Sequence, residues 1–191
     1  GDAAGNYVIV RTFTATDDAG NSSSATQTIT VQDTTAPEFT FVPADYTVEC
    51  SDEMPMDDAV ASDNCGEVTI EVSSETTAGD AAGNYVIVRT FTATDDAGNS
   101  SSATQTITVE DTTAPEFTFV PEGFAVSCSS ELPAEYDMAT AADNCGEVSV
   151  ELTFAEVPGD VDGAYTLVLT YTATDDAGNS NTAEVEIEVG A

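Results

Sequence analysis

Three short segments rich in aspartate and asparagine are the parts of this sequence most able to do chemistry. All three occur in two sets, Asp-Asp-Ala-Gly-Asn at 95–99 and 175–179, Asp-Asn-Cys-Gly at 63–66 and 143–146, and Asp-Thr-Thr-Ala-Pro at 33–37 and 111–115, and a further Asp-Asp-Ala-Gly-Asn lies alone at 17–21. Carboxylate and amide oxygens are the ligands that Ca²⁺ prefers, about six to eight around each ion. If folding brings the segments together, they could hold calcium.

The candidate calcium ligands are the aspartates and asparagines of these segments. They are Asp33, Asp63, Asn64, Asp95, Asp96 and Asn99 in one set, and Asp111, Asp143, Asn144, Asp175, Asp176 and Asn179 in the other. The spacing matches no EF-hand loop. An alternative is plain turn chemistry on a salt-adapted acidic surface, because aspartate caps turns and glycine adopts positive φ. The acidic stretch 51–62 is a weaker, separate source of ligands.

The four cysteines, Cys50, Cys65, Cys128 and Cys145, are expected to form disulfides. Each complete repeat of the sequence holds two of them, so we predict the bridges Cys50–Cys65 and Cys128–Cys145 within repeats. A zinc site needs more ligands than two thiolates, and the chain has no histidine to add. Disulfides imply an oxidising compartment, hence a secreted or cell-surface location.

Catalysis is not expected, and we assign no catalytic residue. The chain has neither histidine nor lysine, which removes most triads, imidazole bases and Schiff-base chemistry. Composition alone leaves a paired-carboxylate hydrolase open. A small repeated module without tryptophan is nevertheless a poor candidate for such an enzyme.

The formal charge of -34 over 191 residues excludes several partners. The two cations are arginines, Arg11 and Arg89, so the surface repels nucleic acid and anionic lipid. No apolar run is long enough for a membrane span, so direct membrane insertion is not expected. The chain opens at Gly1 without methionine, which suits a fragment of a longer protein.

The sequence is an array of repeats, and its elements must position the acidic segments. Residues 1–31 recur unchanged at 79–109, and a looser copy begins at Gly159. We expect a C-terminal half repeat at 1–32 and complete repeats at 33–110 and 111–191. A half repeat cannot bury enough apolar surface alone. Its missing strands either precede Gly1 or come from another chain.

Period-two alternation indicates strands throughout. Tyr165, Leu167, Leu169, Tyr171 and Ala173 alternate with polar or smaller residues, and Ala183 to Val189 alternate with glutamates. About six or seven short strands in each complete repeat predict an all-β fold of tandem Ig-like antiparallel sandwiches. Arg11 and Arg89 break the apolar phase, and we expect them to snorkel outward or to sit at a bulge.

The run TFTATDDAGNS, the DTTAP linker and the DNCG motif together resemble the hyaline-repeat (HYR-like) and related bacterial Ig-like families. The likeness covers the whole chain and is strongest to tandem arrays of Bacteroidetes cell-surface adhesins. It implies adhesion by analogy with that family. The linker is also similar to calcium-stiffened junctions of cadherin-type modules, but Thr35 and Thr113 replace the second aspartate of that pattern.

In an Ig-like topology, the three acidic segments would meet at the pole where the chain enters each sandwich. We therefore expect an extracellular spacer or adhesion array, stiffened by Ca²⁺ at its repeat junctions. Its partners would be neighbouring repeats, surface polysaccharide or other copies in a fibre. Alternatives are a fibre subunit completed by strand exchange and an accessory binding module of a secreted enzyme.

Overall fold

The computed structural model of the chain describes residues 5–79, 81 and 83–191. Contacts among the described residues divide the chain into two compact units. One unit has the bounds Gly1–Tyr46, Pro55–Thr76 and Ile87–Ile107, and the other Thr47–Met54, Thr77–Val86 and Thr108–Ala191. The predicted repeat boundaries after residues 32 and 110 stay a prediction from the sequence period.

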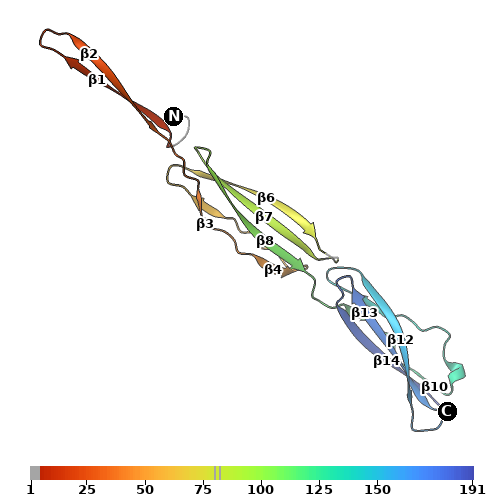
Figure 1. Cartoon of the computed structure of the whole chain (residues 1–191). Coiled ribbons are helices and arrows are strands. Elements are labelled where there is room, and N and C mark those ends of the chain that lie inside the picture. The colour runs from red at the N-terminus through yellow and green to blue at the C-terminus, as the bar shows by residue number, and fades with distance from the viewer. Residues whose placement is uncertain (1–4, 80, 82) are drawn as a thin grey trace. The chain divides into compact units, whose positions relative to one another are not determined.

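Strands account for almost all regular structure in the described residues (Figure 1). The first eight are β1 (Tyr7–Thr16), β2 (Ser22–Val31), β3 (Glu38–Phe41), β4 (Tyr46–Glu49), β5 (Val60–Ser62), β6 (Val68–Ala78), β7 (Tyr85–Asp95) and β8 (Ser100–Glu110). The others are β9 (Glu116–Phe119), β10 (Ala125–Val126), β11 (Thr140–Ala142), β12 (Val148–Pro158), β13 (Tyr165–Asp175) and β14 (Ser180–Val189), with a short 3₁₀ turn η1 (Ser129–Glu131) before β11.

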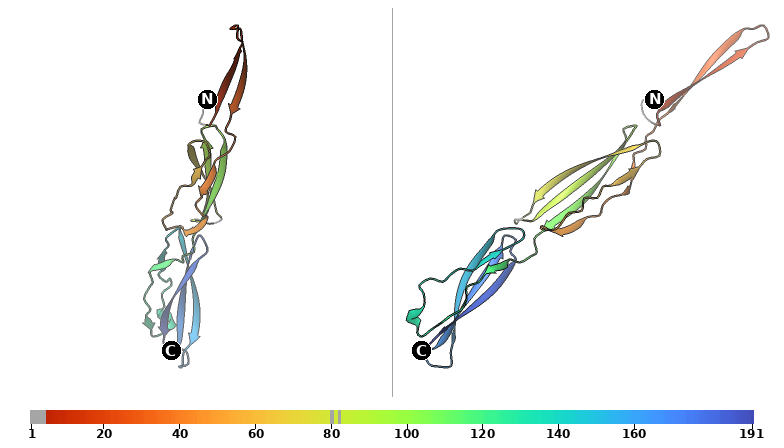
Figure 2. Two further views of the ribbon diagram at one scale, coloured as in Figure 1. Left: turned by 90° about the vertical axis from the view of Figure 1, so that its left-hand side faces the viewer. Right: turned by 180° about the vertical axis from the view of Figure 1, so that it is seen from behind.

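The strands form several small sheets, and one arrangement of sheets occurs twice. β3 pairs with β5, and β4, β8, β7 and β6 lie in that order in a four-stranded sheet. The same arrangement returns as β9 with β11, and as the sheet β10-β14-β13-β12. Figure 2 shows the blue strands β13 and β14 lying beside cyan β12 in both views. The fold is all-β and of the Ig-like sandwich class, as predicted.

The core is built on the alternation expected from the sequence. In β13, Leu169, Tyr171 and Ala173 are buried while the threonines between them are half-buried. Val185, Ile187 and Val189 of β14 pack into the same cluster. Each inward side chain removes apolar surface from water, which is the main favourable term in folding. Within residues 124–128 the structure forms only the two-residue strand β10.

The pairing is antiparallel except at β10, which lies parallel to β14. Ala125 pairs with Glu188, and the Phe124 carbonyl accepts a hydrogen bond from the Glu188 N–H. The chain leaves the small β9-β11 sheet at Pro121 and joins the edge of the larger one. The expectation of purely antiparallel sandwiches is corrected at this edge strand.

The expectation that Arg89 snorkels outward is wrong. Arg89 is only 5% exposed, and its guanidinium lies 4.9 Å from the centre of the Phe91 ring. It donates to the Asp57 carbonyl at 2.8 Å and to Gln105 Oε1 at 3.0 Å. A buried cation is tolerated because these acceptors replace water. Asp58 lies 3.7 Å away but is largely exposed, so this ion pair adds little.

The β1–β2 hairpin forms a two-stranded sheet with ten residue pairs from Tyr7–Val31 to Thr16–Ser22. Its apolar side chains are exposed, Phe13 to 53% and Val10 to 62%. Arg11 lies 5.4 Å from the Phe13 ring on this open hairpin. The hairpin therefore forms its backbone ladder without burying a core among the described residues.

Candidate functional site

The strand period itself aims the first acidic side chain inward. In β7, Phe91 and Ala93 occupy alternate buried positions, and Asp95 is the next residue in the same phase. The turn after it closes with a hydrogen bond from the Asn99 N–H to Asp95 Oδ1 at 2.9 Å. The Asn99 amide also donates to Asp95 Oδ2 at 2.8 Å. A carboxylate is thus held at the buried end of the strand.

Asp33, Asp63 and Asp95 meet at one place within the first unit. One carboxylate oxygen of each lies within 4.8 Å of the others. They come from the segment before β3, the loop after β5 and the end of β7. We call them the first aspartate triad.

Each aspartate of the first triad accepts a hydrogen bond from a backbone N–H with one of its carboxylate oxygens. Asp33 Oδ1 accepts from the Thr35 N–H at 3.1 Å, and Asp63 Oδ2 accepts from the Cys65 N–H at 2.8 Å. The other oxygens, Asp33 Oδ2 and Asp63 Oδ1, are buried and have no hydrogen-bond partner within the described residues. Leaving such oxygens unpaired is costly, by about 1–3 kcal/mol or more for charged groups.

The second unit repeats this arrangement with Asp111, Asp143 and Asp175, the second aspartate triad. Asp111 Oδ1 accepts from the Thr113 N–H at 3.2 Å, while its buried Oδ2 has no partner in the part of the chain described. Asp143 Oδ2 accepts from the Cys145 N–H at 2.8 Å. The two triads therefore share one geometry built from the same three segments.

The surroundings of Asp111 disfavour the charged form of its carboxyl group. Burial is the largest cause that raises the pKa of its carboxyl above the ordinary value, and the charges of Asp143 and Asp175 add to it. At Asp95, burial also acts to raise the pKa, but hydrogen bonds from Asn99 and the turn backbone outweigh it and lower the pKa. Three ionised carboxylates in such proximity repel one another unless a cation lies between them.

The remaining candidate ligands make hydrogen bonds of their own, some of them to triad residues. The Asn99 and Asn179 amides donate to the carbonyls of Asp33 and Asp111 at 3.4 and 3.2 Å. The carboxylates of Asp96 and Asp176 lie 3.4 Å from the N–H groups of Glu67 and Glu147, and Asn64 lies against Cys65. With its amide oriented to satisfy its neighbours, Asn144 donates to Asp143 and accepts from Ser51.

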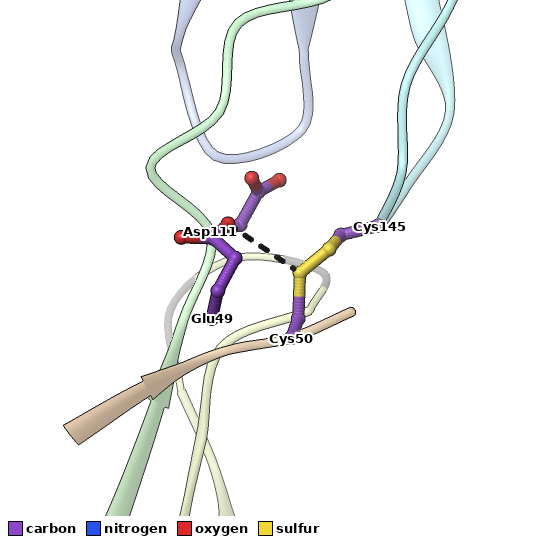
Figure 3. Close-up of side chains that lie close together, drawn as sticks. All are labelled: Glu49, Cys50, Asp111 and Cys145. Carbon is purple, nitrogen blue, oxygen red and sulfur yellow. Dashed lines mark hydrogen bonds between the residues drawn. A yellow bond between two sulfur atoms is a disulfide. The ribbon is translucent and has the colours of Figure 1, made fainter. Parts of the chain in front are cut away.

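A glutamate that sequence reasoning did not single out lies beside the second triad. Glu49 ends β4, and its carboxylate accepts from the Thr112 N–H at 3.0 Å and from the Thr112 hydroxyl at 2.8 Å. These hydrogen bonds lower the pKa of Glu49. Figure 3 shows its side chain beside Asp111 and the bridged sulfur atoms of Cys50 and Cys145. In the sequence, the position of Glu49 directly before Cys50 could have indicated that it lies near the disulfide.

The disulfide joins Cys50 to Cys145, with Cα atoms 6.0 Å apart (Figure 3). The predicted bridges Cys50–Cys65 and Cys128–Cys145 are therefore wrong. Cys50 comes directly after the end of β4. Cys65 lies in the loop after β5, near Asp33 of the first triad. A bridge requires Cα atoms within about 7 Å. Cys50 instead meets the corresponding loop of the next repeat.

Cys65 and Cys128 carry free thiols within the described residues. The Cys128 sulfur lies 3.0 Å from the Ser130 hydroxyl. Among the described residues, no helix is both long and apolar enough to cross a membrane.

Comparisons with known proteins place the sequence among repeat modules. The family described as "HYR-like domain with 4 cysteines" matches residues 40–109. Hyalin of Lytechinus variegatus is 35% identical over 192 residues, covering 93% of this chain and 36% of that protein. The "Sushi, von Willebrand factor type A, EGF and pentraxin domain-containing protein 1" of Mus musculus is 29% identical, covering 90% of this chain and 5% of that protein.

Among solved structures, Drosophila N-cadherin EC1-4 is similar at a TM-score of 0.39 and 17% identity, over 99% of this chain and 58% of that one. The chain spans about a third of the length of its Lytechinus relative. Because the relatives above are animal proteins, the expected tie to Bacteroidetes adhesins has no support. Over residues 40–109 the chain is similar to HYR-like repeat domains.

Proposed function

We propose that this chain is a non-catalytic segment of an extracellular adhesion or spacer array, in which each aspartate triad binds Ca²⁺ at a repeat junction. The observation that carries the proposal is the set of buried carboxylate oxygens without a partner in the described residues: Asp33 Oδ2, Asp63 Oδ1 and Asp111 Oδ2. Asp33 is 8% exposed and Asp111 is 6% exposed, so water reaches them poorly. A hard cation satisfies such oxygens.

The residues present fit calcium better than a transition metal. Each triad offers carboxylate oxygens, and the nearest sulfur atoms at the second triad are joined in a disulfide. A bridged cysteine is not a thiolate ligand. One divalent ion would neutralise two of the three carboxylate charges of a triad. The remaining single negative charge suits an oxygen-rich calcium site.

At each triad, calcium would join three parts of the chain. In the second triad these are the segment that precedes β9, the loop after β11 and the turn after β13. Asp111 Oδ1 and Asp143 Oδ2 keep their backbone hydrogen bonds, so the ligand oxygens are already aimed. Calcium would thereby fix the incoming segment against two loops of the sandwich that it enters.

The Cys50–Cys145 bridge supports an extracellular location, because disulfides persist in oxidising compartments. The name of the mouse relative includes EGF, and EGF domains are a disulfide-dense class of secreted module. The excess of acidic over basic side chains suits calcium-containing, salty surroundings. Adhesion partners, surface polysaccharide or other copies of the chain, belong to this proposal as its expected targets.

A calcium titration of the chain and two matched variants tests the proposal. Asp95 and Asp17 lie in the same sequence, TFTATDDAGNS, but Asp17 is in the exposed β1–β2 turn and outside both triads. We expect Asp95→Asn to abolish one of the two tight sites, and Asp17→Asn to keep both. Calorimetry at fixed moderate salt measures the stoichiometry. Equal loss in both variants, or weak non-saturating binding by the native chain, would contradict the proposal.

A further inference from the structure

The same sequence occupies two different environments in this molecule. Residues 1–31 and 79–109 are identical. Phe13 is 53% exposed and its counterpart Phe91 is fully buried, while Ile9 is 42% exposed and its counterpart Ile87 only 9%. Because the residues are the same, the difference lies in what covers them.

The cover of the second copy comes from residues 33–78. Arg89 donates to the Asp57 carbonyl at 2.8 Å, Gln105 to the Ala44 carbonyl at 2.9 Å, and Ser101 to the Pro37 carbonyl at 2.6 Å. In the hairpin, Arg11 has no comparable partner among the described residues and lies only over Phe13. The open face of β1–β2 thus lacks the segment that precedes its copy.

Cys65 is placed like the bonded cysteine Cys145. A methyl group on Gly5 would lie 3.0 Å from Cys65 Cβ, and one on Gly83 would lie 3.2 Å from Cys145 Cβ. The N–H groups of both cysteines donate to an aspartate of their triad at 2.8 Å. The partner of Cys145 is Cys50, which lies in the segment covering the second copy. Cys65 is unbonded within the described residues.

We infer that the apolar face of β1–β2 and the thiol of Cys65 form one docking surface for a segment like residues 33–78. The occupant is a segment with the sequence pattern of 33–78, because residues 33–78 directly precede and cover 79–109, which are identical to 1–31. Its own cysteine, the counterpart of Cys50, bonds to Cys65. Each repeat is thereby covalently linked to the next. The inference rests on the array part of the proposed function and is independent of calcium.

The bond-forming step requires an oxidant. Two thiols lose two protons and two electrons to form the disulfide, and a low-molecular-weight disulfide such as oxidised glutathione takes them up as two thiols. The Cys65 thiolate, or its partner, attacks the small disulfide, and the second thiolate then displaces the small thiol. The docked segment aligns the two sulfurs, so this second step is intramolecular.

The test extends the full chain by repeating residues 33–78 ahead of Gly1, with the added copy of Cys65 replaced by serine. After oxidation with glutathione, alkylation and peptide mapping report which thiols remain. In the native chain we expect peptide mapping to find Cys65 and Cys128 alkylated or carrying glutathione, and in the extended chain to find Cys65 bonded to the added cysteine while Cys128 is still alkylated or carrying glutathione. Cys128 serves as the internal control because the added segment has no contact with it in this scheme.

A second readout follows the apolar face. The sequence has no tryptophan, so Tyr7→Trp reports only the hairpin. Its emission should shift to shorter wavelength in the extended chain, because the ring leaves water. A thiol at Cys65 that stays reactive, with unshifted emission, would overturn the inference. A bond between Cys65 and Cys128 of a second copy would also overturn it, and would assign the face to a fibre contact.

A third arm guards against misfolding of the extended chain. Residues 33–78 with Cys65→Ser are added as a separate peptide to the native full chain under the same oxidation. Faster mixed-disulfide formation at Cys65 than at Cys128 supports the docking surface, and equal rates contradict it. Calcium binding by the native chain is measured in parallel, so a failure here is distinguishable from a failure of the proposed function.

Discussion

At the scale of single residues, Asp33, Asp63 and Asp111 each divide their two oxygens between two tasks. One oxygen of Asp33 and one of Asp63 accept backbone N–H groups, and the other is buried without a partner in the described residues. The turn chemistry and the calcium hypothesis, which the sequence offered as alternatives, thus use different oxygens of the same side chains. A turn alone explains the paired oxygens and leaves the unpaired ones unexplained.

The buried arginine gives a second residue-scale contrast. Arg89 and Gln105 in one repeat correspond to Leu169 and Val185 in the next, which lie opposite each other in β13 and β14. The polar pair and the apolar pair are therefore alternative ways to fill one position. Replacing a hydrogen-bonded polar pair by apolar residues is often neutral, whereas removing one partner is destabilising.

We expect Arg89→Leu alone to lower the free energy of unfolding by about 2–4 kcal/mol, because it leaves the Gln105 and Asp57 oxygens unpaired. Arg89→Leu with Gln105→Val should recover most of that loss. Urea unfolding of the native chain, both single variants and the double variant gives the coupling between the two sites. Additive effects would contradict the exchange of one pair for another.

At the scale of elements, strand period and turn chemistry could be predicted, and contacts between repeats could not. The inward phase of β13 and β14 follows from apolar residues at alternate positions. The parallel pairing of β10 and the Cys50–Cys145 bridge have no local signal, because each depends on where a distant segment ends. Counting cysteines per repeat favoured the wrong pairing for this reason.

The turn before β7 lies close to the bridged Cys145 at Gly83. Gly83 has φ +83° and Gly98 has φ +91°, so an added Cβ strains both backbones by about 1–2 kcal/mol. A Cβ at Gly83 would also lie 3.2 Å from Cys145 Cβ, whereas one at Gly98 meets nothing within 4 Å.

We therefore expect Gly83→Ala to destabilise the chain by roughly 1 kcal/mol more than Gly98→Ala. Gly83→Ala should also weaken calcium binding at the second triad, since Asp111 Cβ lies 3.5 Å from the added methyl. Thermal unfolding and calcium titration of both variants measure the two effects. Equal losses would show that only the positive φ matters at Gly83.

At the scale of the whole molecule, the proposed calcium ions would reconcile the high negative charge with structural order. A formal charge of -34 destabilises the folded state by self-repulsion. Calcium at the two triads would remove that repulsion where it is most concentrated, and any ligand that binds only the folded state stabilises it by mass action.

Chelation should therefore lower the melting temperature by several degrees, and moderate sodium chloride alone should not restore it. The double variant Asp95→Asn, Asp175→Asn should melt at the same temperature with or without calcium, because one ligand is missing from each triad. Scanning calorimetry in calcium and in chelator makes the comparison. A calcium-dependent shift that persists in the double variant would place the ion elsewhere.

The most direct measurement is anomalous diffraction from crystals grown with calcium. If calcium occupies the triads, a peak lies at the centre of each, about 2.3–2.6 Å from Asp33 Oδ2 and Asp63 Oδ1 in the first and from Asp111 Oδ2 in the second. Well-ordered triads without a peak at saturating calcium, with those oxygens hydrogen-bonded to water, would contradict calcium binding at the triads.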